Sequence, residues 1–453
     1  MTRWIRWKGN MTSLLLISLA ALTATCRFAA DPPQPNVVVI LMDTLRPDYL
    51  GFYGYEEEKA HFLAELAERA VVFERAFSTS SWTAPSTSSL FTSLYPHQHG
   101  VIEGFLMHRT RSKRREDAGI ETIELNRLPA DVATLPEVFQ SMGYTTFGLA
   151  ANINVGEEIG FNRGFDRFER DSEASAAFFL ERVTEWRDDI RQSEPFFLYL
   201  HLNDVHRPYH KRLPYYQKQE AKLGNRRARY LSELSYADEH LRKIYETLDL
   251  GKDTVVVALS DHGEEFRDHG GLAHQAKLYI ELNRVLMMIH APFLELEPRR
   301  VALNVSLIDV LPTLVELAGG AEEEGLFDRQ GVSLVPALRN SERTGDLIET
   351  LRRRILFGHR VSRDESQDPL WAATLRHWKL IEKPDAPREL YNHRRDPTER
   401  RDLYSSHAEG IPVKLVDAIE EFKEVGLASE PERVEVEIDS ELEEQLRSLG
   451  YVN

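Results

Sequence analysis

Three short apolar runs, each followed at once by polar residues, constrain the fold of this chain most strongly. The runs are Asn36–Met42 (NVVVILM), Pro195–Leu202 (PFFLYLHL) and Thr254–Leu259 (TVVVAL). Runs of this length are typical of strands that are buried on both faces of a parallel sheet. Helical patterns alternate with them, so we expect an α/β fold with a mostly parallel central sheet and helices on both faces.

Polar residues stand directly after each predicted strand. Asp43 and Thr44 follow the first, residues 203–206 (NDVH) follow the second, and residues 260–263 (SDHG) follow the third. Ligand sites of open α/β sheets lie beyond the carboxyl ends of the strands. The three polar clusters are therefore expected to converge on one crevice.

The sequence divides into three predicted parts: residues 1–35, 36–340 and 341–453. The middle part carries the strand-and-helix alternation, with helices expected at 61–74, 133–142, 172–191, 230–248 and 305–318. After residue 340 an alternating stretch at 371–381 and a charged helical tail at 435–449 predict a smaller C-terminal α+β subdomain.

Residues 1–35 resemble an export segment and linker. Basic residues precede the apolar run Leu14–Leu22, which is far shorter than the ~20 apolar residues of a spanning helix. Cys26 is the single cysteine of the chain and stands where a lipoprotein signal has its lipidated residue, although Thr23 replaces the usual leucine. Lipidation, cleavage nearby and an uncleaved anchor remain alternatives. Each predicts a catalytic domain outside the cytoplasm, in the periplasm or cell envelope.

Composition limits the classes of partner. The chain has 453 residues, 42% of them hydrophobic and 28% charged, which is typical of a globular protein. With 56 Lys and Arg against 73 Asp and Glu, the net charge is -17. We therefore expect no nucleic-acid partner. An anionic substrate would need a local cationic site, such as a metal ion.

Asp43, Asp261 and His262 are candidate ligands of such an ion. Each has a structural alternative, because Asp caps helices and Asp-His-Gly forms turns. Their joint position at strand ends, with His206 and His274 also available, favours a site. Two carboxylates and an imidazole can hold one divalent cation. The imidazole favours Mn²⁺ or Zn²⁺, and Ca²⁺ remains an alternative.

Thr83 is the candidate nucleophile and a further metal contact. It lies in a Ser/Thr-rich stretch, residues 78–93, which could instead be a flexible loop. A helix from about Pro85 would place free N–H groups and a positive dipole end beside Thr83. Transfer of a phosphoryl or sulfuryl group needs such positive charge and an activated hydroxyl.

Six segments resemble, in order and spacing, the landmarks of the sulfatase family of the alkaline-phosphatase superfamily. They are PNVVVILMDTLRPDYLGFYGY, SWTAPSTSSLFTSLYPHQHGV, LHLNDVHRPY, LSDHGEEFRDHGG with LAHQAKLYIE, VSLIDVLPTLVELAG and RHWKLIEKPDAPRELYNHRRDPTERRDLY. The resemblance implies an alkaline-phosphatase-like fold and a covalent ester intermediate. By position it implies metal ligands at Asp43, Asp261 and His262, and a nucleophile at Thr83.

The same resemblance implies that His206 and His274 contact the anion or protonate the leaving group. Asp204 with these two histidines could hold a second metal ion. One metal ion is favoured, because the histidines contact substrate in the sulfatase pattern.

The chain departs from that pattern at the nucleophile. The family has Cys or Ser, any residue, Pro, any residue, Arg, and its Cys or Ser is oxidised to formylglycine. Here the segment reads from Thr83 to Thr87 as TAPST, and threonine cannot yield that aldehyde. Thr44 replaces the second Asp of an Asp-Asp pair, and the family's Lys has no counterpart near residues 148–152.

We therefore expect a metal-dependent hydrolase of sulfate or phosphate esters, with phosphodiester chemistry favoured on mechanism. The substrate would be an anionic ester of a carbohydrate, a lipid headgroup or an aryl group. A catalytically silent surface binding protein is the alternative, motivated by the losses at positions 44 and 87. The retained set of Asp43, Asp261 and His262 argues against it.

Overall fold

The computed structural model describes residues 34–105, 113–115, 119–218, 224–274, 277–320, 329–339, 344–360, 369–407, 410–427 and 432–448. The predicted export segment with Cys26 lies outside these ranges. Residues 34–453 form one compact unit. No helix in the described ranges has the length and apolar content that a membrane span needs.

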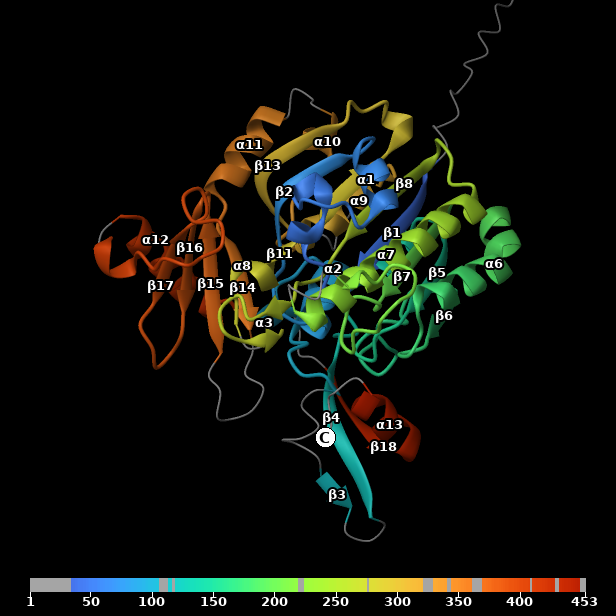
Figure 1. Ribbon diagram of the computed structural model, residues 1–453, viewed down its shortest axis with the longest axis horizontal. Helices are drawn as coiled ribbons and strands as arrows, with labels where there is room; N and C mark the ends of the chain where they lie inside the picture. Colours follow the sequence, from blue (N-terminus) through green and yellow to red (C-terminus); the bar gives the residue numbers. More distant parts are fainter. Residues whose placement is uncertain are drawn as a thin grey trace, which may run out of the picture. The chain divides into compact units, whose positions relative to one another are not determined.

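A nine-stranded sheet lies at the centre of this unit (Figure 1). Its order is β11–β2–β12–β8–β1–β7–β5–β6, and β13 pairs with β2. Strands β8, β1, β7, β5 and β6 are parallel, whereas β11 and β12 run against their neighbours. The bounds are β1 Asn36–Met42, β2 Val71–Phe77, β5 Thr145–Ala150, β6 Arg167–Arg170, β7 Phe196–Leu202, β8 Thr254–Leu259, β11 Arg284–Val285, β12 Met287–His290 and β13 Arg299–Ser306.

Helices cover both faces of the sheet. On one side of β1, Val37, Val39 and Leu41 pack into a core with α2, α5 and α9. On the other side, the alternate residues Val38 and Ile40 pack into a core with α1, α6 and α7. The bounds are α1 His61–Ala67, α2 Thr83–Thr92, α5 Leu135–Ser141, α6 Ala176–Gln192, α7 Asn225–Leu248 and α9 Val310–Leu317. The predicted α/β class with a doubly covered, mostly parallel sheet is confirmed.

The helix predicted at 61–74 is wrong in its second half. Helix α1 ends at Ala67, and residues 71–77 form β2, which pairs with β11, β12 and β13. The β-branched and aromatic residues at 71–73 suit a buried strand, and pairing with three neighbours outweighs the helical period. The predicted helix at 305–318 is shorter for the same reason, because its first two residues belong to β13.

The charged tail is also not helical throughout. Glu432–Ile438 forms β18, which pairs antiparallel with β4 (Ile120–Arg127), and α13 follows at Ser440–Ser448. The period-two pattern of ERVEVEI fits a strand better than a helix. Strand β3 (Lys113–Arg115) pairs with β4 on its other side. Figure 1 shows β4, β18 and α13 side by side.

The C-terminal subdomain contains a four-stranded antiparallel sheet in the order β14–β15–β16–β17. Leu415 and Ile419 of α12 pack on it. The bounds are β14 Leu356–Arg360, β15 Leu370–Leu375, β16 Trp378–Glu382, β17 Glu389–Asn392 and α12 Ile411–Lys423. The predicted smaller α+β subdomain is confirmed, and its boundary at residue 341 stays a prediction.

A buried ion cluster around Glu399 joins this subdomain to the rest of the unit. Glu399 Oε1 lies 3.2 Å from Lys379 Nζ and 2.6 Å from His393 Nε2. Its Oε2 accepts a hydrogen bond of 2.8 Å from the backbone N–H of Ile280. Burial alone would raise the pKa of Glu399, but Lys379 and His393 lower it to about 2. The buried negative charge of Glu399 is therefore stabilised by its two partners, Lys379 and His393.

Replacing Glu399 by Gln should destabilise the protein strongly. The substitution keeps the shape but leaves Lys379 charged and buried, which typically costs about 3–5 kcal/mol of unfolding free energy. Chemical denaturation measures it. Glu349→Gln is the matched control, because Glu349 forms a half-exposed pair with Arg352 and should lose at most about 1 kcal/mol. Equal losses in the two variants would contradict a stabilising cluster.

Candidate active site and metal centre

The polar residues predicted to converge do lie together beyond the carboxyl ends of β1 and β8. The two strands are parallel neighbours, with Leu41 paired to Leu259, so Asp43 and Asp261 emerge at the same edge. Asp43, Asp261 and His262 are each 0% exposed. The site is thus built into the sheet rather than into a surface loop.

Two carboxylate oxygens in this site face one imidazole nitrogen. Nε2 of His262 lies 3.5 Å from Asp43 Oδ1 and 3.4 Å from Asp261 Oδ2. Neither oxygen has a hydrogen-bond partner among the described residues. Burial and the charge of Asp43 raise the pKa of Asp261 well above its usual range. Because buried carboxylates are costly without a counter-charge, this cluster fits a divalent cation.

The tautomer of His262 also fits a metal ligand. Its Nδ1 lies 2.9 Å from the carbonyl oxygen of Gly263. A carbonyl only accepts, so Nδ1 carries the hydrogen and Nε2 presents a lone pair to the two carboxylates. Histidines that bind metals commonly donate their other N–H to a backbone carbonyl in this way.

Thr83 lies beside this cluster as the first residue of α2. Its Oγ1 is 3.2 Å from Asp43 Oδ2 and 3.3 Å from His262 Nε2. The helix begins two residues before the predicted start at Pro85, so its free N–H groups and positive dipole end lie at Thr83 itself. A hydroxyl in this position can act as a nucleophile on an anionic group.

His206 and His274 form another wall of the site. Their rings lie 5.0 Å apart, and the ring of His274 is 4.6 Å from that of His262. His206 donates from Nδ1 to the carbonyl oxygen of Arg207 at 2.6 Å. Its Nε2 has no partner within the described ranges and is available to a ligand. A cavity of about 300 Å³ opens beside His206 and Asn203.

Asp204, His206 and His274 do not form a group of ligand atoms within 4.8 Å of one another among the described residues. Asp204 Oδ1 instead accepts a hydrogen bond of 3.1 Å from Ala176, the first residue of α6. The described part of the chain brings together one group of ligand atoms within 4.8 Å of one another, and that group is Asp43, His201 and Asp261. This group contains His201 and not the predicted ligand His262, although His262 Nε2 lies 3.5 Å from Asp43 and 3.4 Å from Asp261. The expectation of one metal ion stays a prediction.

His201 and Asn152 belong to the site but were not predicted. His201 Nε2 lies 3.3 Å and Asn152 Nδ2 2.6 Å from the same oxygen, Asp43 Oδ2. His201 is the one imidazole inside the apolar run of β7, which is the signal that could have found it. Asn152 comes two residues after the end of β5, but the short segment TTFGLA was not expected to be a strand.

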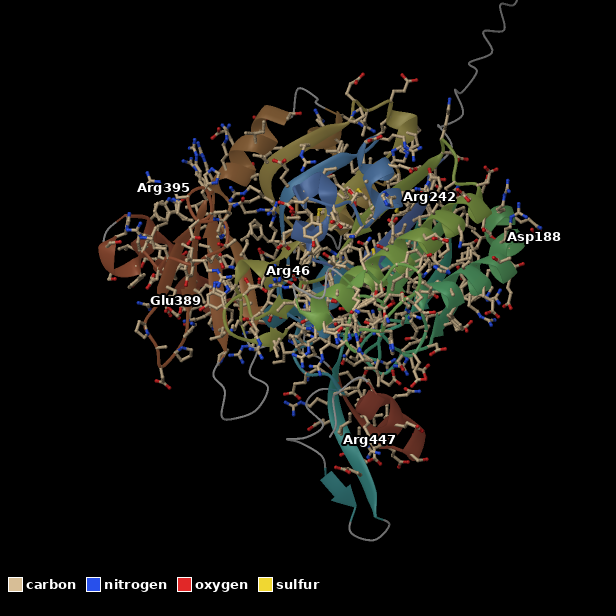
Figure 2. All side chains as sticks on the ribbon, in the orientation of Figure 1. Arg46, Asp188, Arg242, Glu389, Arg395 and Arg447 are labelled. Carbon is tan, nitrogen blue, oxygen red and sulfur yellow. The ribbon has the colours of Figure 1, made fainter. Side chains whose placement is uncertain are left out.

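Arg46 connects two segments of the site through ion pairs and a hydrogen bond. Arg46 is 5% exposed and lies near the middle of the view in Figure 2, whereas Asp188 lies at its edge. Its guanidinium forms ion pairs of 2.7 Å with Asp48 and with Asp268, and donates to the carbonyl oxygen of Glu264 at 2.9 Å. The loop after β1 is thereby fixed to the segment between His262 and His274.

Thr44, at the position of the family's second Asp, makes structural contacts. It adopts a left-handed φ of 58°, its N–H lies 3.3 Å from Asp261 Oδ1, and its hydroxyl donates to the carbonyl oxygen of Val205. Thr44 thus links the three strand-end segments.

Comparison with known proteins agrees with this architecture. The chain is 25% identical over 384 residues to Delta 4,5-hexuronate-2-O-sulfatase of Bacteroides thetaiotaomicron, covering 70% of this chain and 75% of the relative. It is 22% identical over 452 residues to the uncharacterized sulfatase YidJ of Escherichia coli, covering 86% and 87%.

Two solved structures show the same fold. A 2-O GAG sulfatase superposes with a TM-score of 0.66 at 21% identity, covering 86% of this chain and 93% of that one. The phosphonate monoester hydrolase of Agrobacterium radiobacter superposes with a TM-score of 0.68 at 18% identity, covering 86% and 95%. The sulfatase family model matches residues 35–321, more than half of the chain. The protein is therefore a hydrolase of the sulfatase family with an alkaline-phosphatase-like fold.

Proposed function

We propose that this hydrolase cleaves an anionic ester through a covalent intermediate on Thr83. The observation that carries the proposal is the position of Thr83 Oγ1, 3.2 Å from Asp43 and 3.3 Å from His262 at the start of α2. Asp43, Asp261 and His262 would hold one divalent metal ion, with Thr83 as a further contact. That ion would supply positive charge for the nonbridging oxygens of the ester.

The protein's own side chains can carry each step of the reaction. Thr83 Oγ1 forms a bond to phosphorus or sulfur while the bond to the leaving oxygen breaks. The hydroxyl proton moves toward Asp43 Oδ2, the acceptor that it faces. His206 or His274, in its protonated form, gives a proton to the leaving oxygen. Water then gives a proton to the histidine that protonated the leaving oxygen and attacks phosphorus or sulfur. The bond to Thr83 Oγ1 breaks, the phosphate monoester or sulfate leaves, and Oγ1 takes back the proton held at Asp43.

Two observations favour different esters. The named relatives are sulfatases, which supports sulfate esters. Threonine cannot form the aldehyde hydrate that lets a sulfated enzyme expel sulfate by elimination, so water must attack the central atom. Attack of this kind is the chemistry of phosphodiester hydrolysis. The neutral amide of Asn152 lies 3.4 Å from Thr83 Oγ1, and the sequence has no lysine at residues 148–152. We therefore favour a phosphodiester.

The imidazole ligand favours Mn²⁺ or Zn²⁺ over Ca²⁺. The leaving group would be a carbohydrate, a lipid headgroup or an aryl group. Export through residues 1–35, with or without lipid attachment at Cys26, would place the enzyme in the periplasm or cell envelope.

Substitution of Thr83 tests the nucleophile. Val has nearly the shape of Thr but no hydroxyl, so Thr83→Val should lower kcat at least ~1000-fold. Thr83→Ser is the matched control, because it keeps the hydroxyl, and should retain measurable turnover. The assay compares nitrophenyl sulfate, nitrophenyl phosphate and bis-nitrophenyl phosphate, and we expect the diester to be the best substrate.

Turnover by Thr83→Val at the rate of the unmodified enzyme would refute the nucleophile. A protein that binds metal but turns over none of the three esters would favour the silent binding protein. If nitrophenyl sulfate is the best substrate and Thr83→Val loses its turnover, Thr83 remains the nucleophile but the favoured substrate becomes a sulfate ester.

Metal binding should stabilise the protein. At Mn²⁺ concentrations about 100 times the dissociation constant, the stabilisation is about 2.7 kcal/mol, seen as a rise in Tm. Asp261→Asn should abolish that rise. In the absence of metal this variant should be at least as stable as the unmodified protein, because it removes the repulsion between two buried carboxylates.

The exposed Asp188 of α6 provides the control, since Asp188→Asn should leave the metal-induced rise unchanged. A full rise in Tm for Asp261→Asn would show that the ion binds elsewhere.

A further inference from the structure

We propose that His201 is a positioning residue, which orients Asp43 through an Nε2–H hydrogen bond, and that Tyr199 fixes the tautomer needed for this bond. The proposal deepens the proposed function and rests on its metal site. In the fold, His201 and Tyr199 lie on the same face of β7, two residues apart, and β7 is the parallel neighbour of β1.

The tautomer of His201 follows from Tyr199. The Tyr199 hydroxyl lies 2.8 Å from His201 Nδ1, and both side chains are fully buried. The ring of Tyr199 packs against Phe91 and Phe165, and its hydroxyl has no other hydrogen-bond partner in the described ranges. If Tyr199 accepted from His201, its own hydrogen would be buried without an acceptor, which costs about 1–3 kcal/mol. Tyr199 therefore donates to Nδ1.

Because Nδ1 of His201 accepts, the hydrogen of the neutral ring lies on Nε2. Nε2 faces Asp43 Oδ2 at 3.3 Å, and a carboxylate oxygen is its natural acceptor. His262 and His206 have the opposite tautomer, since their Nδ1 atoms face the carbonyl oxygens of Gly263 and Arg207. In their neutral form those two rings present a lone pair at Nε2, whereas His201 presents a hydrogen.

The hydrogen bond from His201 is one of three that hold the same oxygen of Asp43, and we call the three donors, Asn152, Thr83 and His201, the clamp. Oδ2 is approached by three donors: Asn152 Nδ2 at 2.6 Å, Thr83 Oγ1 at 3.2 Å and His201 Nε2 at 3.3 Å. The other oxygen, Oδ1, has no hydrogen-bond partner among the described residues and faces His262 Nε2 at 3.5 Å. The clamp therefore fixes which carboxylate oxygen points toward the ligand atoms of the site.

The competing interpretation is that His201 is itself a metal ligand. Its ligand atom lies within 4.8 Å of those of Asp43 and Asp261, so distance alone permits this. The tautomer argument opposes it, because a protonated Nε2 has no lone pair to give. The two interpretations predict different behaviour of a glutamine at this position.

Calorimetric titration with Zn²⁺ alone, on the full protein, distinguishes them. Loss of an orienting residue around a metal site typically weakens binding about 10–100-fold, which we expect for His201→Ala. His201→Gln should recover most of that loss, because its amide N–H₂ can donate to Asp43 Oδ2. Tyr199→Phe should also weaken binding. His262→Gln, which removes a proposed ligand, serves as the reference for complete loss.

Binding by His201→Gln as weak as by His201→Ala would overturn the positioning role in favour of direct ligation. Unchanged binding by His201→Ala would overturn any role for His201 while leaving the metal site intact. Absence of Zn²⁺ binding by the unmodified protein would overturn the metal site itself and this proposal with it. The failures are thus separable.

The tautomer can be measured directly, even if the alanine variant does not fold. Nitrogen-15 NMR of histidine-labelled protein, with the His201 signals identified from the His201→Gln spectrum, should show hydrogen on Nε2 with and without Zn²⁺. Tyr199→Phe should convert His201 to a mixture of tautomers. An unprotonated Nε2 in the Zn²⁺-loaded protein would refute the proposal.

Discussion

The structure of the site depends on one electrostatic constraint. Asp43 and Asp261 bury two carboxylates beside His262, and one oxygen of each has no hydrogen-bond partner in the described part of the chain. Such a pair is unfavourable in a protein interior unless a cation compensates it. The parallel neighbours β1 and β8 bring the two carboxylates to one edge of the sheet, and the start of α2 adds Thr83. This charge arrangement suits an anionic ester, which is the substrate class that we propose.

The fold supports the site from several directions. The turn after β1 is fixed by Arg46 and by Thr44, which contact the segments that follow β7 and β8. The C-terminal subdomain contributes through Glu399, whose ion cluster reaches the segment after His274. The subdomain thus contacts Ile280, a residue more than a hundred positions earlier in the chain than Glu399.

Much of this could be predicted because strand ends are local features. The sequence alone shows an apolar run followed by Asp43, and another followed closely by Asp261 and His262. Neither pattern requires knowledge of which strands pair. What could not be predicted depends on pairing between distant segments. Residues 71–74 were predicted to be helical but belong to β2, a strand with three partners in the nine-stranded sheet. Strand β18 is likewise defined by its pairing with β4. His201 was missed because its role appears only when β7 lies beside β1.

The central claim is that the hydroxyl of Thr83 forms the covalent bond to substrate. Mass spectrometry of enzyme quenched during turnover of bis-nitrophenyl phosphate measures this most directly. The account predicts a phospho adduct on the peptide that contains Thr83, localised to that residue by fragmentation. An adduct on any other residue, or turnover in which no adduct ever accumulates under conditions that slow the second step, would contradict it.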